Sequence, residues 1–281
     1  MNDDSQTKQA LTYALGANDA AARRLEIQDA QFAAISERLL DGLSLRPNDR
    51  VVELGMGAGS FSRRILNRLG KAGVLVGIDK TQGLLDQAAR SLAPLSGPHL
   101  ELKLADISEA ESWLSDADVV VGRTVLHHLE MPEVLLGRWR HVLRPGTRLG
   151  FIEPEFRVLI GRLAALEQQS RGELAPLRRW AEGISRYYQI CGLSPTIGAT
   201  LARTLAAAGY EQVETEWFEC PMDANGIENI LLYYDEIRDR YEASGVMSAA
   251  QIDRDKQLLA ALPTDDLPAI WGMYCVTCRQ A

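Results

Sequence analysis

Three glycines on alternate positions follow a short apolar run near residue 50. The stretch "VVELGMGAGS" covers residues 51–60 and places Gly55, Gly57 and Gly59 just after the acidic residue Glu53. Glycine has no Cβ, so the backbone of such a turn can lie directly against a ligand. A dinucleotide-binding turn needs the spacing GxGxxG, whereas the spacing here is GxGxG, which disfavours a dehydrogenase.

A second acidic residue closes the next apolar run. Asp79 ends "VLVGID", and a carboxylate at this position can accept from both hydroxyls of a ribose. The glycine turn lacks the lysine of GxxxxGKS, so it is poorly suited to a pyrophosphate. The residues therefore favour a nucleoside without phosphates, such as adenosine joined to a zwitterionic amino acid.

Alternating strand and helix patterns must position these residues. Apolar strand-like runs occupy residues 50–54, 74–78, 99–104, 117–122 and 147–153, and helical patterns separate them at 61–69, 84–92, 108–113 and 133–143. Such alternation predicts an α/β fold in which helices cover both faces of a parallel sheet. Ligands of this fold bind at the carboxyl ends of the strands.

The flanking segments predict further elements. Residues 21–43 read as one helix packed across the sheet edge, and a helix at 199–208 precedes strands at 210–219 and 271–278. We expect residues 1–49 to close over the cofactor and residues 50–156 and 198–281 to form the core. The remaining parts are a helical cap inserted at 157–197, over the strand ends, and a second helical insertion at 223–266.

Composition excludes several classes of protein. The chain has 281 residues and a net charge of −8, without a basic run, so we expect no nucleic-acid partner. It has no secretion-type leader and no apolar stretch of 18 residues, which predicts a cytoplasmic protein without a membrane segment. Cys275 and Cys278 form a CxxC within a strand pattern, where positions three apart face opposite sides; we therefore expect buried thiols and no metal site.

Four segments in succession resemble the motifs of the class I S-adenosylmethionine-dependent methyltransferases. They are "VVELGMGAGSFS", "VLVGIDKTQGLLDQA", "LKLADIS" and "VLHHLEMPEVL" with the following "HVLRPGTRLGFIEPE". The upstream "LTYALGANDAAARRLEIQ" is similar to the leading helix of a bacterial small-molecule branch, which has a Tyr and an RLxxQ segment. The resemblance implies a Rossmann-like, seven-stranded, mostly parallel sheet and S-adenosylmethionine as the cofactor.

The resemblance also assigns the cofactor-binding residues. Glu53 and the glycine backbone would hold the methionine portion, Asp79 the ribose, and Asp106 with Ile107 the adenine, beside Lys80. Arg123 would offer its backbone or guanidinium to the methionyl end. Tyr13 and Gln28 either close over that end or, for Tyr13, simply pack in the helix. Taken singly, Asp106 could equally be a helix N-cap.

Candidates for the chemistry lie after the fourth and fifth strands. His127 is a candidate general base for the methyl acceptor, with packing as its alternative. Glu153 either orients the substrate or bonds to the backbone of a neighbouring loop. His128 either packs or contacts the acceptor, and Tyr187 and Tyr188 of the cap are expected to contact it too.

These residues predict a methyltransferase that acts on a small molecule with an aromatic or heterocyclic body, such as a specialised metabolite. A lid suits a ligand that can be enclosed. The alternatives are methylation of an RNA or a protein, and a cofactor-binding protein of the same fold that lacks turnover. A homodimer is a candidate assembly.

Overall fold

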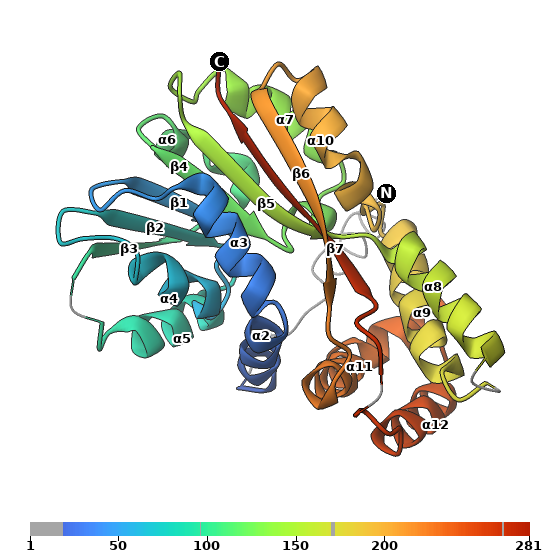
Figure 1. Cartoon of the computed structure of the whole chain (residues 1–281). Helices are drawn as coiled ribbons and strands as arrows, with labels where there is room; N and C mark the ends of the chain where they lie inside the picture. Colours follow the sequence, from blue (N-terminus) through green and yellow to red (C-terminus); the bar gives the residue numbers. More distant parts are fainter. Residues whose placement is uncertain (1–18, 96, 170–171, 266) are drawn as a thin grey trace, which may run out of the picture.

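The computed structural model describes residues 19–95, 97–169, 172–265 and 267–281, and they form one seven-stranded sheet (Figure 1). The strand order is β3-β2-β1-β4-β5-β7-β6, and β7 runs in the opposite direction to the other six strands. The predicted mostly parallel seven-stranded sheet is therefore confirmed. The strands are β1 (Arg50–Leu54), β2 (Val74–Asp79), β3 (His99–Leu104), β4 (Val119–Arg123), β5 (Arg148–Pro154), β6 (Glu211–Cys220) and β7 (Trp271–Arg279).

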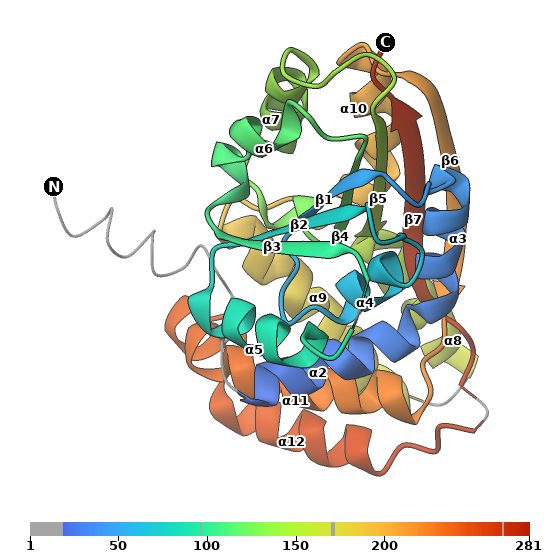
Figure 2. The same ribbon diagram turned by 90° about the vertical axis from the view of Figure 1, so that its left-hand side faces the viewer.

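Helices cover both faces of this sheet (Figure 2). On one face lie α3 (Ala33–Leu43), α4 (Ser60–Leu66) and α5 (Gln82–Leu92). The other face carries α6 (Glu111–Leu114), α7 (Pro132–Arg140) and α10 (Ile197–Ala207). Cys275 belongs to the first core and Cys278 to the second, so the two thiols lie on opposite faces, as the strand pattern predicts.

The central parallel strands are buried on both faces, which explains their aliphatic runs. In β4, Val119, Val120 and Val121 are all fully buried, and they alternate between the two cores. The edge strand β3 is only half buried. Carboxyl ends of β1, β2, β4 and β5 consequently meet at one edge of a rigid layer, where they can hold a site.

The helix expected over residues 21–43 is two helices, α2 (Asp19–Gln31) and α3. The break falls at Phe32, which is fully buried and packs edge-on against Trp271 with ring centroids 5.4 Å apart. The expected position across the sheet edge was also wrong. Helix α3 crosses the face of the sheet, where Leu39 and Leu43 lie so close to β5 that a Cβ at Gly150 would come within 2.7 Å of both.

Five helices gather at the end of the sheet where the parallel strands finish (Figure 1). They are α2, α8 (Phe156–Gln169), α9 (Ala175–Ile190), α11 (Ala224–Ser244) and α12 (Ala249–Ala260). The short η1 (Ile107–Glu109) follows β3, and η2 (Leu126–His128) follows β4. Helices α2 and α11 lie side by side (Figure 2), joined by a buried hydrogen bond from Asn229 to Gln31. No helix among the described residues is long and apolar enough to cross a membrane.

Candidate active site

A cavity opens at the carboxyl ends of β1, β2, β4 and β5. It contains about 1350 Å³ of space outside protein atoms, part of it open to solvent. His127, His128 and Tyr188 line this cavity. Most of the residues predicted to bind the cofactor line it too: Gln28, Glu53, Gly55, Gly57, Asp79, Lys80, Asp106, Ile107 and Arg123.

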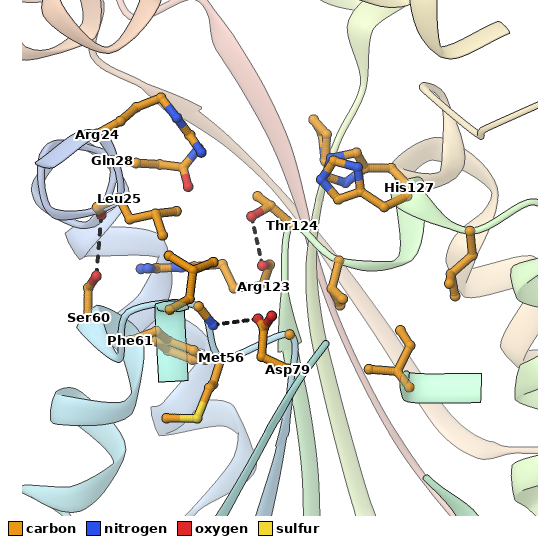
Figure 3. A pocket seen from close by; sticks show the side chains of 18 of the residues that line it. Arg24, Leu25, Gln28, Met56, Ser60, Phe61, Asp79, Arg123, Thr124 and His127 are labelled. Atoms are coloured by element: carbon orange, nitrogen blue, oxygen red, sulfur yellow. Dashed lines mark hydrogen bonds between the residues drawn. The ribbon is translucent and has the colours of Figure 1, made fainter. Parts of the chain in front are cut away.

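The glycine turn and Asp79 form one hydrogen-bonded unit. Gly55 and Gly57 have φ values of +63° and +56°, a region that only glycine enters without cost. Asp79 Oδ2 accepts from the Gly57 N–H at 2.9 Å (Figure 3), and Oδ1 accepts from the Thr81 N–H at 2.9 Å. Each carboxylate oxygen has a second lone pair, so this group at the cavity wall can still accept from ribose hydroxyls. This acceptor group fits the hydroxyls of a nucleoside.

Glu53 is buried below the turn. Its Oε2 accepts from Ser62 Oγ at 2.6 Å, and the side chain is only 2% exposed. Burial raises the pKa of Glu53 to about 8, although Ser62 and the charge of Arg123 oppose the shift. At neutral pH the protein therefore keeps a proton on Glu53, which a nearby ligand cation would displace.

Two of the predicted cofactor residues, Asp106 and Gly59, lie at helix N-caps. Asp106 Oδ1 accepts from Ser108 N–H at 2.9 Å and so caps η1, while the side chain also borders the cavity. Gly59 does not line the cavity and we correct its assignment. It caps α4 with φ +86°, and a Cβ there would lie 2.9 Å from Leu92 of α5. Gly59 serves helix packing.

Helix α2 forms the wall opposite the strand ends. Gln28 points from it into the cavity (Figure 3). Arg123 reaches toward α2, and its guanidinium is held by Asp29 at 2.6 Å and Ser36 at 3.0 Å, over the ring of Phe61. Tyr13 lies outside the described residues.

The side chain of Glu153 holds the loop that carries His127. Its carboxylate accepts from the backbone N–H groups of Val125 at 3.0 Å, Leu126 at 2.7 Å and His127 at 3.3 Å. It also lies 2.6 Å from His127 Nδ1. Glu153 is fully buried and does not line the cavity, so it cannot orient a substrate directly. The loop-bonding alternative is correct.

This bond determines which imidazole nitrogen can act as a base. A carboxylate only accepts, so Nδ1 of His127 carries a proton, and in the neutral imidazole Nε2 is the nitrogen with the lone pair. His128 differs: burial and neighbouring His127 lower its pKa well below the usual 6.5. His127 is held by the carboxylate of Glu153.

Aromatic side chains build the other end of the cavity. Tyr188 of α9 stacks on His127 with ring centroids 5.5 Å apart and planes 19° apart. The same end is lined by Phe156, Trp180, Ile184, Tyr233 and Trp271. We call these five, with Tyr188, the aromatic chamber. Tyr187 lies outside the cavity, fully buried against Tyr241 with centroids 5.5 Å apart, so we reassign it from substrate contact to helix packing.

Several lining residues were missed from the sequence. Tyr233 and Asn229 come from α11, and Trp271 begins β7; none belongs to a recognisable motif. Arg24 and Leu25 of α2 did carry a signal, because they begin the RLxxQ segment that ends at Gln28.

Comparison with known proteins agrees with this geometry. Residues 52–149 match the family model described as a methyltransferase domain. An uncharacterized 37.1 kDa protein in transposon TN4556 of Streptomyces fradiae is 35% identical over 120 residues, which are 42% of this chain and 34% of that protein. The match thus spans about a third of that relative's length.

Aklanonic acid methyltransferase of Streptomyces sp. strain C5 is 24% identical to this chain, over 77% of this chain and 99% of that enzyme.

A solved structure shows the same fold. Phosphoethanolamine N-methyltransferase 2 of Haemonchus contortus, in complex with S-adenosyl-L-methionine, superposes with a TM-score of 0.53. The identity is 14%, and the superposition covers 88% of this chain and 52% of that one. Residues 52–149 are thus similar to a methyltransferase domain, and the fold agrees with the class I S-adenosylmethionine-dependent methyltransferases, a family whose cofactor is S-adenosylmethionine.

Proposed function

We propose that this chain methylates a small molecule with a flat aromatic or heterocyclic body. One observation carries the proposal: a single cavity joins the glycine turn and Asp79 to the aromatic chamber. Rings stack favourably on rings, and an enclosed chamber excludes water around a small acceptor. The relatives support this substrate class, because one is named for aklanonic acid and another is nocamycin O-methyltransferase of Saccharothrix syringae.

The bound cofactor supplies an activated methyl group on a sulfonium. The chain must align the methyl acceptor with the cofactor's methyl group and exclude water from both. Asp79 would hold the ribose, Asp106 and Ile107 the adenine, and the turn at Gly55 and Gly57 the methionyl backbone. The helices at 156–190 and 224–260 would serve as a lid over the acceptor, since both contribute side chains to the aromatic chamber.

His127 is the proposed general base. Its Nε2 would take the proton from an acceptor hydroxyl or ring N–H as the methyl arrives, and Glu153 would stabilise the resulting imidazolium through Nδ1. Such assistance typically contributes about 10²–10⁴ in rate. Replacing His127 with Asn should therefore cost at least a hundredfold in turnover and remove the acid limb of the pH–rate profile. An acceptor that is already deprotonated would leave turnover within a few-fold.

The substrate class is tested with methyl-labelled S-adenosylmethionine. The purified protein is incubated with a panel of phenols, aromatic carboxylic acids and N-heterocycles, and in parallel with bacterial RNA and protein. We expect label in aromatic products, and at a cofactor concentration that does not saturate the enzyme the Asp79→Ala variant should form them more slowly. Label confined to RNA or protein contradicts the proposal, and so does the absence of label from every fraction.

A further inference from the structure

Two indole N–H groups of the aromatic chamber have no hydrogen-bond partner among the described residues. They belong to Trp180 of α9 and to Trp271, the first residue of β7, and both side chains line the cavity. Trp180 is 1% exposed and Trp271 is 6% exposed. The two ring centroids lie 5.0 Å apart, with the ring planes at 64°, so both unpaired donors lie in the same part of the chamber.

An indole N–H can only donate, and a buried one cannot exchange its missing bond for one to bulk water. Such a donor destabilises the folded protein, which is why buried polar groups are nearly always paired. An unpaired indole alone does not indicate a site: Nε1 of Trp139 also lacks a partner among the described residues, and Trp139 lies in the core and not at the cavity. The chamber differs because it combines two such donors with a cavity wall.

The chamber extends along one face of α9. Trp180, Ile184 and Tyr188 follow one another at intervals of four residues, and all three line the cavity. Eight residues of α-helix span about 12 Å, so Trp180 is distant from the end where Tyr188 stacks on His127. An acceptor that contacts both ends therefore has an elongated body, with one polar group for His127 and another for the two indoles.

The charge of the chamber favours an uncharged group at the indole end. None of its six residues is Asp, Glu, Lys, Arg or His. Burial raises the pKa of Tyr233 well above its usual range, which keeps the hydroxyl neutral. The nearby cation Arg24 is already paired with Glu236. A carboxylate would lose its hydration here without gaining a cation, whereas the oxygen of a ketone, ester or amide costs much less to desolvate.

We propose that the methyl acceptor carries an uncharged carbonyl oxygen at the end opposite the methylated group, and that the indole N–H groups of Trp180 and Trp271 bind this oxygen. The two tryptophans then determine specificity, because an analogue without the oxygen leaves both buried donors unpaired. The inference rests on the proposed function, since it takes the chamber as the acceptor site and His127 as the neighbour of the reacting group.

The test uses three hydroxybiphenyls that differ only in the group at the far end from the hydroxyl, which is acetyl, ethyl or carboxylate. Each compound is titrated calorimetrically into the protein saturated with S-adenosylhomocysteine, and each is also tested as a methyl acceptor with S-adenosylmethionine. The wild type should bind the acetyl compound about tenfold more tightly than the ethyl compound, and more tightly than the carboxylate. Trp180→Phe/Trp271→Phe should bind the acetyl and ethyl compounds within about threefold of each other.

A matched control and a spectroscopic measurement separate the hydrogen bonds from packing. Trp139→Phe also removes a buried, unpaired indole, but one outside the cavity, so this variant should keep the preference for the acetyl compound. With carbon-13 in the carbonyl, the stretching band of the bound acetyl compound should lie at lower frequency in the wild type than in the double variant. The single variants Trp180→Phe and Trp271→Phe, which each keep one donor, should give intermediate bands and serve if the double variant does not fold.

The outcomes distinguish this inference from the proposed function. Equal affinity of the wild type for the acetyl and ethyl compounds overturns the inference, and so does a preference or a band that the folded variants leave unchanged. Methyl transfer to either compound would then still support the proposed function. Tighter binding of the carboxylate also overturns the inference, because the indole end would then take a charged group. Binding of none of the three compounds overturns it as well, and the acceptor panel described above then decides the proposed function separately.

Discussion

Replacing Glu153 with Gln should reverse the tautomer of His127 with little change in shape. The carboxylate receives three backbone N–H groups and the imidazole Nδ1, and all four are donors. A Gln side chain has one accepting oxygen and one donating NH₂. If the oxygen stays with Val125 and Leu126, as Oε1 does now, the NH₂ faces His127, where Nδ1 must become the acceptor. Nε2 then carries the proton.

The magnitudes follow from these four bonds. The His127 backbone N–H, 3.3 Å from Oε2, loses its acceptor in the variant. One buried donor without a partner costs about 1–3 kcal/mol of unfolding free energy. Turnover should fall by about 10²–10⁴, because a protonated Nε2 cannot take the proton of the methyl-accepting substrate.

The tautomer can be measured without knowing the acceptor. Nitrogen-15 NMR of the imidazoles should show a proton on Nδ1 of His127 in the wild type and on Nε2 in Glu153→Gln, with His127→Asn identifying the signals. Chemical denaturation gives the stability change. The reasoning is refuted if the wild-type proton is on Nε2, or if the variant reverses the tautomer and keeps normal turnover.

Three further predictions follow from the site. Asp79→Ala should weaken S-adenosylhomocysteine by roughly 1–3 kcal/mol, since it removes a charged acceptor for two hydroxyls; unchanged affinity in calorimetry refutes the ribose assignment. Burial raises the pKa of Glu53 to about 8, so at pH 7 it is protonated in the free protein, and a bound ammonium group should displace this proton. The affinity for the ligand should then rise with pH up to about 8. Calorimetry in buffers of different ionisation heat measures the proton release on binding. Glu53→Gln should abolish this release. Proteolysis within residues 157–197 should slow when cofactor product and acceptor are both bound, and equal cleavage with and without them argues for a fixed lobe.

The strands and the cofactor end were predictable because their signals are local. The apolar run and glycine turn at 50–60 fix a buried strand and positive φ angles at Gly55 and Gly57 within ten residues. The bond from Gly57 to Asp79 then follows from adjacent parallel strands, whose carboxyl ends lie side by side.

What could not be predicted depends on contacts between distant segments. The helical pattern of 21–43 is continuous in sequence, yet Phe32 interrupts it to pack on Trp271, more than two hundred residues later. In the same way, Tyr187 and Tyr188 are adjacent aromatic residues of one helix, and only the position of α11 decides that Tyr187 faces Tyr241 while Tyr188 faces His127. Tertiary packing overrides local pattern at these positions.

A crystal structure with S-adenosylhomocysteine tests the central claim most directly, that one cavity holds the cofactor at the glycine turn and the acceptor beside His127. The account predicts ribose hydroxyls on Asp79, the amino-acid end beside Gly57, and the sulfur turned toward the aromatic chamber. A ligand whose adenine or amino-acid end fills the aromatic chamber, leaving no space beside His127, would contradict it.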